Sequence, residues 1–368
     1  MNPLTPALLD QWLDWICTIQ QIPAPTFNES RRAAYLKTEF TRLGLADVEL
    51  GARGNVLAHW PGGNARPLVI SAHLDTVHRV DSPLPLVRTD SRITGPGIAD
   101  NSTSLAALLV LAVLLKENQL SYPGDIWLVA DVCEEGLGNL AGMQAVVDRF
   151  QDQPAAYIIL EGLGLGQVCH RGLGVVRYQV KAETAGGHSW VDYGSPSAIH
   201  ELAQVVADLT GLTVPKKPRA SLNVGIIQGG TSINTIASQA HFELDLRAED
   251  QTTLSRLSER VRHSILRREK TGVVFSIEPI GNRPAGELPV NHPLVTLAQD
   301  VLRQLNIPVT LEVGSTDANI PLSRGYPAVC IGLTSGSYPH TPREYIEIQP
   351  LTAGLQQLLN LIERIWRI

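Results

Sequence analysis

The sequence predicts an α/β fold in which a doubly wound, mostly parallel sheet is interrupted by an inserted ferredoxin-like α+β domain. Near both ends of the chain, continuously apolar runs alternate with helical patterns, which is typical of strands and helices in such a sheet. In the middle of the chain, apolar and polar residues alternate, as in strands with one solvated face. The 368 residues are 44% hydrophobic and 18% charged, which suffices for two domains with substantial cores.

The strands of the parallel sheet are predicted from short runs rich in Val and Ile and bounded by turn residues. These runs are residues 67–72, 125–132, 155–160 and 327–333. Helical patterns lie between them over residues 102–118 and 142–150. We therefore expect residues 1–174 and 286–368 to form one domain together.

The inserted domain is predicted from the order of its elements. Half-solvated strands are expected over residues 175–183, 221–228, 240–246 and 273–279. Amphipathic helices are expected over residues 197–212 and 252–267. The resulting order, strand, helix, strand, strand, helix, strand, is that of a ferredoxin-like unit, which we place at residues 175–285.

Charge argues against nucleic acid as a partner. The chain has 36 acidic and 30 basic residues and a net charge of -6, and no run of Lys and Arg is longer than the short stretch around Lys216. The N-terminal apolar stretch contains Asp10 and Asp14 and lacks a basic leader, so we expect an amphipathic helix there and no signal peptide. The longest apolar run, residues 105–115, is shorter than the roughly 20 residues that cross a bilayer.

Cysteine usage favours a reducing compartment. The four cysteines are scattered, without the C-x-x-C spacing of a zinc knuckle or the pattern of a disulfide framework. We therefore expect a cytoplasmic protein.

Polar residues follow the predicted buried strands, where ligands collect in open α/β sheets. They are His73 with Asp75, Asp100 with Asn101, Glu134 with Glu135, Glu161, and His340 near the C-terminus. Imidazole and carboxylate mixtures suit Zn²⁺, Co²⁺ or Mn²⁺, and cations would offset the cost of gathering several carboxylates. Strand alternation places His73 and Asp75 on the same side, so Asp75 is expected to accept the second imidazole N–H. Of Glu134 and Glu135, one would bind metal and the other would handle a proton.

These motifs, in this order and spacing, resemble the M20 family of co-catalytic metallopeptidases. The resemblance extends from about residue 67 to residue 347 and includes Gly186-Gly187-His188-Ser189 and Gly229-Gly230-Thr231-Ser232-Ile233-Asn234. It implies a catalytic domain formed by the two ends of the chain, and an insert that acts as a lid and dimerisation domain.

The resemblance also implies roles for the polar residues. Asp100 would bridge two metal ions, with His73 and Glu161 completing one site and Glu135 and His340 the other. Glu134 would be the general base, with Asp75 beside it in the catalytic set. The family pattern further places a non-proline cis peptide bond after the bridging aspartate.

Residues of the lid are expected to contact substrate. The resemblance implies that His188 reaches an active site, often that of a partner subunit, to bind the oxyanion or substrate, so a homodimer is expected. Asn234 and Arg283 resemble groups that bind a substrate carboxylate, and Arg247 is a weaker candidate for the same role. Trp190 is bulkier than the small residue often found at its position, which would narrow the substrate pocket.

Structural alternatives remain for several of these residues. Asp100 would otherwise cap the helix that begins near residue 102, and Glu161 or His340 would be ordinary loop residues. Arg247 would otherwise pair with a neighbouring acid.

The leading function is metal-dependent hydrolysis of an amide bond in a small peptide. An N-acyl-amino-acid deacylase is the alternative, because it would use the same metals and base. An inactive, peptide-binding relative is disfavoured, because Glu134 and all five ligand positions are present.

Overall fold

The computed structural model describes residues 4–117 and 121–368, and the chain divides into two units. The first unit joins both ends of the chain, Met1–Gly172 with Glu287–Ile368. The second unit is the middle segment, Leu173–Gly286. The middle segment is thus an insertion in the sequence of the first unit, and it begins at Leu173, close to the expected residue 175.

The first unit is built on a nine-stranded sheet with the order β1-β2-β6-β3-β7-β17-β8-β15, in which β16 also pairs with β8. The strands are β1 (Ala46–Leu50), β2 (Val56–Trp60), β3 (Ala65–His73), β6 (Gly124–Asp131), β7 (Ala156–Leu163), β8 (Gln167–Gly172), β15 (Gly286–Glu287), β16 (Thr310–Gly314) and β17 (Ala328–Thr334). The four strands predicted from the sequence are β6, β3, β7 and β17, and they run parallel to one another as expected. Antiparallel pairs, β1 with β2 and β2 with β6, extend the sheet on one side.

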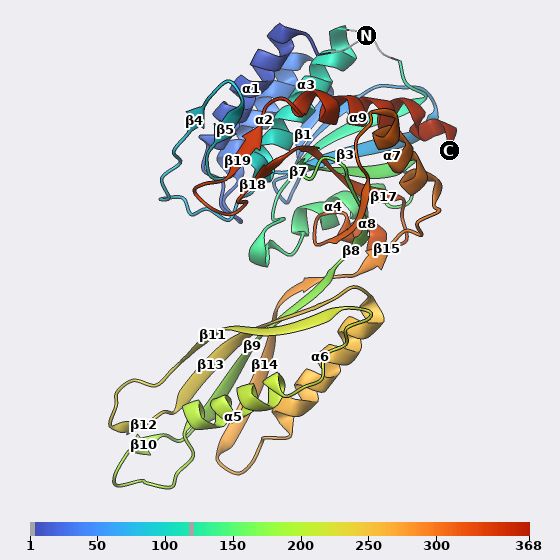
Figure 1. The fold of residues 1–368 in the computed structure, drawn as a ribbon. Coiled ribbons are helices and arrows are strands. Elements are labelled where there is room, and N and C mark those ends of the chain that lie inside the picture. Colours follow the sequence, from blue (N-terminus) through green and yellow to red (C-terminus); the bar gives the residue numbers. More distant parts are fainter. Residues whose placement is uncertain (1–3, 118–120) are drawn as a thin grey trace. The chain divides into compact units, whose positions relative to one another are not determined.

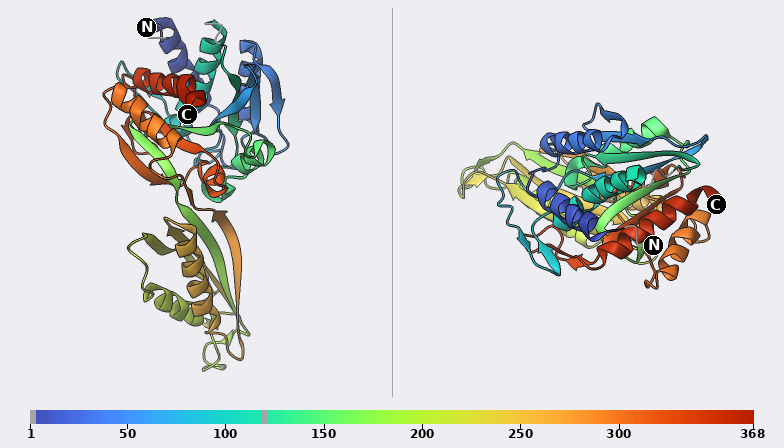
Figure 2. Two further views of the ribbon diagram at one scale, coloured as in Figure 1. Left: turned by 90° about the vertical axis from the view of Figure 1, so that its right-hand side faces the viewer. Right: turned by 90° about the horizontal axis from the view of Figure 1, so that it is seen from above.

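Helices cover both faces of this sheet, which explains why its central strands are apolar throughout. They are α1 (Pro6–Gln20), α2 (Ser30–Leu43), α3 (Thr103–Glu117), α4 (Ala141–Phe150), α7 (Pro293–Gln304), α8 (Asn319–Ser323) and α9 (Leu351–Arg364). In Figure 1, α1, α3 and α9 lie above the sheet, and α4 and α8 lie below it; Figure 2 shows the same unit from two other sides. The first unit also has three short helical turns, η1 (Ile98–Ser102), η2 (Gly136–Gly138) and η3 (Ile365–Arg367).

Helix α3 is the central helix of the core. The predicted helix over residues 102–118 corresponds to α3, although residue 118 lies outside the described residues. The segment Ile98–Glu117 is long and apolar enough to cross a membrane, but 89% of an 18-residue stretch within it is buried inside the structure. Its hydrophobicity is therefore that of a core helix.

The second unit has the predicted ferredoxin-like order. Its elements are β9 (Gly174–Thr184), α5 (Ala198–Thr210), β11 (Ala220–Gly229), β13 (Gln239–Ala248), α6 (Gln251–Leu266) and β14 (Val273–Arg283). The strands form an antiparallel sheet with the order β11-β13-β9-β14. Every second residue of β13, from Ala240 to Ala248, is buried in the core shared with α5 and α6, and Figure 1 shows both helices on one face of this sheet.

Two small sheets connect loops that are distant in sequence. In the first unit, β4 (Val87–Arg88), β5 (Arg92–Thr94), β18 (Gly336–Ser337) and β19 (Tyr345–Glu347) pair in the order β18-β19-β5-β4. In the second unit, β10 (Gly187–His188) pairs with β12 (Thr235–Ile236). The first small sheet joins the segments that carry Asp100 and His340, and the second joins the segments that carry His188 and Asn234.

Candidate metal centre

The predicted ligands gather at one edge of the first unit's large sheet. His73 is the last residue of β3, Glu134 and Glu135 follow the end of β6, and Glu161 lies in the second half of β7. Because these strands are parallel neighbours, their carboxyl ends bring the side chains together. Asp100 comes from the short turn η1 (Ile98–Ser102), which leads into α3.

Asp100 lies between two histidines. Its Oδ1 is 2.9 Å from His73 Nε2, and its Oδ2 is 2.8 Å from His340 Nε2. On one side, Glu161 Oε2 is 3.8 Å from His73 Nε2; on the other, Glu135 Oε1 is 3.2 Å from His340 Nε2. The five side chains thus form two groups of three potential ligands that share Asp100.

The turn that carries Asp100 is held closely against β7. The Asp100–Asn101 peptide bond is cis, as the family resemblance predicted. The side-chain amide of Asn101 donates a hydrogen bond to the Leu160 carbonyl oxygen at 2.9 Å. A Cβ atom at Gly162 would overlap the carbonyl oxygen of Ala99, so glycine is required there for this approach. The predicted Glu161-Gly162 pair therefore supplies both a candidate ligand and the space for the neighbouring turn.

The electrostatics of the cluster favour a cation. Burial lowers the pKa of His73, but hydrogen bonds to the carboxylates of Asp100, Asp75 and Glu161 outweigh burial and raise that pKa well above its usual value. Hydrogen bonds to Asp100 and Glu135 raise the pKa of His340 to about 10. Carboxylates that favour an imidazolium in this way would also favour a divalent ion, which displaces protons from its ligands when it binds.

The donor atoms also fit a metal ion. Asp100 Oδ1 and Glu135 Oε1 are buried, and they face the imidazole nitrogens of His73 at 2.9 Å and of His340 at 3.2 Å. Such oxygens are costly to bury without a compensating charge. Two imidazoles and three carboxylates are a suitable ligand set for Zn²⁺, Co²⁺ or Mn²⁺.

Asp75 has a different main contact from the one expected. His73 Nδ1 lies 3.0 Å from the backbone carbonyl oxygen of Asp75 and 3.5 Å from its carboxylate Oδ1. The strand alternation on which the expectation relied ends at His73, the last residue of β3. The Asp75 carboxylate instead accepts the backbone N–H groups of Glu134 and Glu135, both at 2.9 Å, and the Thr26 hydroxyl at 2.8 Å. Asp75 therefore fixes the turn that carries both glutamates.

Glu134 and Glu135 are both buried, with 5% and 6% of their surface exposed, and they share one group of potential ligands with His73. Glu135 lies with Asp100 and His340 in one group of potential ligands. Glu134 lies only in a group with His73 and Glu135. Of the two adjacent acids, only Glu135 is therefore also grouped with Asp100.

Three buried carboxyl groups near the centre were not predicted. Asp131 and Asp317 are almost completely buried; burial raises the pKa of Asp131 to about 7, and burial together with Asp131 raises that of Asp317. Burial raises the pKa of Glu344 to about 7, although hydrogen bonds from backbone N–H groups oppose this shift. The polar run Gly314-Ser315-Thr316-Asp317 at the end of β16 was a usable signal, because ligands gather at strand ends. Glu344 gave no comparable signal.

His188 and Asn234 lie on neighbouring loops of the second unit. His188 pairs with Thr235 across β10 and β12, and the Ser189 N–H donates a hydrogen bond to the Asn234 carbonyl oxygen at 3.0 Å. His188 is exposed, and its Nδ1 accepts the backbone N–H of Trp190 at 3.2 Å. A neutral imidazole that accepts at Nδ1 carries its proton on Nε2, so Nε2 is a donor.

The two predicted arginines differ in their surroundings. Arg247 lies 2.7 Å from Asp245, which also contacts Arg177 at 2.9 Å, so the ion-pair alternative has direct support. Arg283 pairs with Val175 at the end of β14 and is only 5% exposed. Its role in substrate binding stays a prediction. Trp190, by contrast, is 85% exposed.

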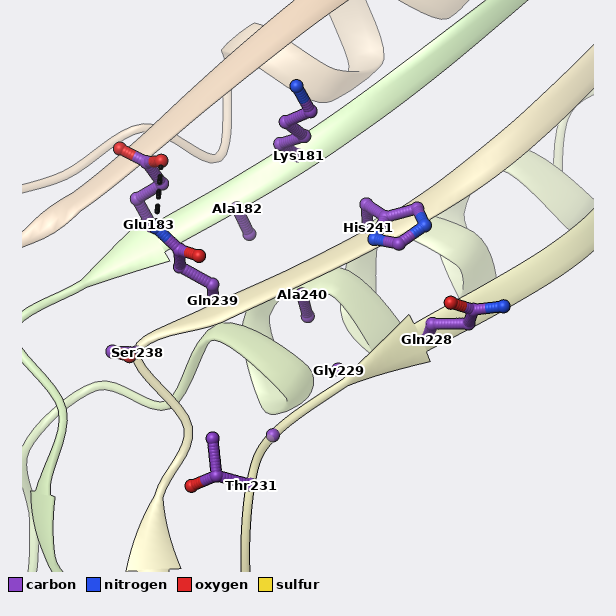
Figure 3. A pocket seen from close by; sticks show the side chains of 11 residues that line it. Lys181, Ala182, Glu183, Gln228, Gly229, Thr231, Ser238, Gln239, Ala240 and His241 are labelled. Carbon is purple, nitrogen blue, oxygen red and sulfur yellow. Dashed lines mark hydrogen bonds between the residues drawn. The ribbon is translucent and has the colours of Figure 1, made fainter.

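A separate hollow of about 510 Å³ lies on the second unit's sheet (Figure 3). Figure 3 shows Lys181, Gln228 and His241 around it, with Gln239 hydrogen-bonded to Glu183. All groups of potential metal ligands found among residues 4–117 and 121–368 lie in the first unit. This hollow is therefore distinct from the candidate metal centre.

Comparison with known proteins identifies the family. Among curated sequences, a peptidase M20 domain-containing protein from Schizosaccharomyces pombe is 29% identical over 63% of this chain and 59% of its own length. A succinyl-diaminopimelate desuccinylase from Bordetella petrii is 28% identical over 63% of this chain and 66% of its own length. The match to a probable carboxypeptidase from Aspergillus terreus spans 48% of that protein, so the chain covers only about half to three fifths of the first such relatives.

Solved structures share the fold over nearly the whole chain. A tripeptidase from Staphylococcus aureus has a TM-score of 0.81 and 22% identity, with 98% of this chain and 99% of that chain covered. The YXEP protein of Bacillus subtilis, described as a dinuclear metal binding peptidase, has a TM-score of 0.72 and 16% identity, with 99% of each chain covered. The sequence model of Peptidase family M20/M25/M40 matches residues 69–364, and the chain therefore belongs to this family.

Proposed function

We propose that this chain hydrolyses an amide bond in a small peptide, as an aminopeptidase, dipeptidase, tripeptidase or carboxypeptidase. The observation that carries the proposal is the position of Asp100, whose carboxylate oxygens lie 2.9 and 2.8 Å from nitrogens of His73 and His340. Asp100 would bridge two divalent ions, with Glu161 beside one and Glu135 beside the other. Zinc is the ion that we propose, and cobalt and manganese would accept the same ligands.

When bound, the two ions would polarise the scissile carbonyl group and lower the pKa of the attacking water. Glu134 would take a proton from that water as general base and deliver it to the leaving amine nitrogen as general acid. This division of roles is supported by the grouping of Glu135, but not of Glu134, with Asp100 and His340. Asp75 would keep both in place through its hydrogen bonds to their backbone N–H groups.

His188 would act on the substrate from a partner subunit. Its Nε2–H is suited to donate to the oxyanion that develops on the scissile carbonyl. The exposure of the His188 loop supports an encounter with a second molecule of this chain. We therefore propose a homodimer formed through the second unit, in which His188 of each subunit serves the other subunit's metal centre.

Asn234 and Arg283 would bind a substrate carboxylate. Asn234 lies on the loop next to that of His188, and its side-chain oxygen accepts the Ser232 hydroxyl at 2.8 Å. The amide N–H₂ group of Asn234 is the donor that would bind the substrate carboxylate. Arg247 is a secondary candidate, because it is already paired with Asp245. A cytoplasmic location fits the four cysteines, all of which are free.

An N-acyl-amino-acid deacylase is the second candidate. The 28% identity to a succinyl-diaminopimelate desuccinylase favours it, because that name describes the removal of a succinyl group, which is an acyl group. The same metals and the same base would serve either substrate, so the difference lies in the groups that line the substrate pocket. An inactive, peptide-binding protein is the third candidate, and the complete ligand set and Glu134 argue against it.

The first experiment is a mass-spectrometric survey of products from short peptides and N-acyl amino acids, with Zn²⁺, Co²⁺ or Mn²⁺ added. Glu134→Gln should remove the products while the protein keeps its metal, and Glu363→Gln, which changes an exposed acid on α9, is the matched control. Products from peptides would support the peptidase, and products from acyl amides alone would support the deacylase. No product from any substrate with metal-loaded protein would favour the binding-protein alternative.

A further inference from the structure

Glu344 lies four residues after His340, and its side chain is completely buried. Its carboxylate accepts hydrogen bonds from backbone N–H groups of two separate segments. In the turn that leads to Asp100, the donors are Gly97 at 3.1 Å, Ala99 at 2.7 Å and Asp100 itself at 2.9 Å. In the C-terminal segment, the donor is the N–H of His340 at 3.3 Å.

The two oxygens divide these contacts. Oε1 accepts the N–H groups of Ala99 and Asp100, whereas Oε2 accepts those of Gly97 and His340. Oε2 therefore links two segments whose metal-ligand candidates are 240 positions apart in the sequence. Each oxygen thus accepts two backbone N–H groups, and the carboxyl group ties the Asp100 turn to the C-terminal segment.

The backbone of Glu344 is fixed as well. Its carbonyl oxygen accepts the Gly95 N–H at 2.8 Å, and the next residue, Tyr345, pairs with Thr94 across β19 and β5. Figure 1 shows these two strands side by side. The small sheet thus brings the Glu344 carboxylate to the Asp100 turn and keeps it there.

Glu344 acts on the ligands through their backbones. It belongs to none of the groups of potential metal ligands among the described residues, and its hydrogen bonds reach N–H groups alone. We propose that Glu344 is a positioning residue that sets the Asp100 and His340 side chains at the spacing needed to hold two ions, an inference that rests on the proposed dinuclear function. Removal of partners that orient metal ligands typically weakens metal affinity about 10–100-fold.

Glutamine is an informative replacement because it has the same shape. An amide nitrogen cannot accept a hydrogen bond, so Glu344→Gln loses two of the four contacts whichever way the amide is oriented. Glu344→Asp keeps two acceptor oxygens on a side chain that is shorter by one methylene group. The matched control is Glu347→Gln, which makes the same change three residues later, where the partly exposed carboxylate contacts Arg92.

The test measures Zn²⁺ affinity of the metal-free proteins by competition with a chromogenic chelator, and compares the thermal unfolding of the same samples. We expect Glu344→Gln to bind Zn²⁺ about 10–100-fold more weakly than the original protein, Glu344→Asp to show a smaller loss, and Glu347→Gln to show none. Excess Zn²⁺ should restore much of the turnover of Glu344→Gln, whereas it should not rescue Glu134→Gln.

Unchanged Zn²⁺ affinity in Glu344→Gln would overturn the inference. If that variant does not fold, Glu344→Asp decides instead, because weaker binding supports the role and unchanged binding contradicts it. The outcome is separable from that of the proposed function. If the unmodified protein binds two ions but cleaves no amide, the proposed function is wrong. The Zn²⁺ affinities of the variants then still test the role of Glu344.

Discussion

The candidate metal centre of the first unit and the His188 loops of the second unit differ in how far their side chains are buried. At the candidate metal centre, His73 is 2% exposed and Glu135 is 6% exposed, and only the His340 side chain, at 52%, reaches solvent to a similar extent as the loops do. On the His188 loops, Trp190 is 85% exposed and Tyr193 is 89% exposed. Buried side chains that are held by several contacts suit metal ligands, which must keep their spacing. Exposed apolar side chains suit a surface that contacts another molecule.

The largest expected effect is at the residue that both metal groups share. Asp100→Asn removes the charge that would bridge two ions, so we expect metal content and turnover to fall together. The control is Asp192→Asn, on the exposed loop, which should leave metal content unchanged. Elemental analysis after dialysis measures the metal content of both variants. Full retention of metal by Asp100→Asn would show that Asp100 is no more important for metal binding than the exposed Asp192.

The next effect concerns the exposed loops. His188→Ala should lower kcat about 10²–10³-fold, the usual cost of losing one oxyanion donor, and should leave metal content unchanged. Mixing His188→Ala with Glu134→Gln tests where His188 acts. If it serves the partner subunit, mixed dimers contain one complete site and activity returns on mixing; if it serves its own subunit, the mixture stays inactive.

The third prediction concerns the close approach of Gly162 in β7 to the turn that carries Asp100. Gly162→Ala places a methyl group where the Ala99 carbonyl oxygen lies, so we expect a stability loss of about 1–3 kcal/mol and weaker metal binding. Gly225→Ala, in the exposed strand β11 and with ordinary contact distances only, is the control. Denaturant unfolding of the metal-free proteins gives the difference, and equal stabilities would show that this close approach is unimportant.

Trp190→Ala should change selectivity more than stability. The side chain is too exposed to contribute much to the core of the second unit, so the melting temperature should stay within a few degrees. If Trp190 narrows the substrate pocket, the variant should accept bulkier peptides, measured as ratios of kcat/KM. An unchanged substrate profile would remove Trp190 from the pocket.

The smallest effect is expected for Arg247. Its half-exposed ion pair with Asp245 contributes roughly 0.2–1 kcal/mol at most, and KM should not change in Arg247→Ala. A large increase in KM for substrates with a free carboxylate would instead establish the substrate role that the sequence left open.

Much of the architecture could be predicted because the hydrophobic pattern of each segment matches its burial in the fold. The apolar runs that became β3, β6, β7 and β17 are buried on both faces, and the alternation that predicted β13 is seen in its buried core residues. The antiparallel strands β1 and β2, which extend the sheet beyond β6, were not predicted, because their apolar runs are too short.

Contacts that depend on distant segments could not be predicted. The ligand set followed from motif order, but the acceptor of the His73 Nδ1 hydrogen bond depends on where β3 ends. Glu344 is joined to the Asp100 turn by the pairing of β5 with β19, and neither short strand has a periodic pattern of its own. Asp131 carries no signal within its apolar strand, because its importance comes from facing Asp317.

The most direct test of the central claim is the number of metal ions per chain, measured by native mass spectrometry after reconstitution with Zn²⁺. We expect two ions in the original protein and in Glu134→Gln, and fewer in Asp100→Asn. A single ion in the original protein, or two ions retained by Asp100→Asn, would contradict a centre in which one aspartate bridges two metals.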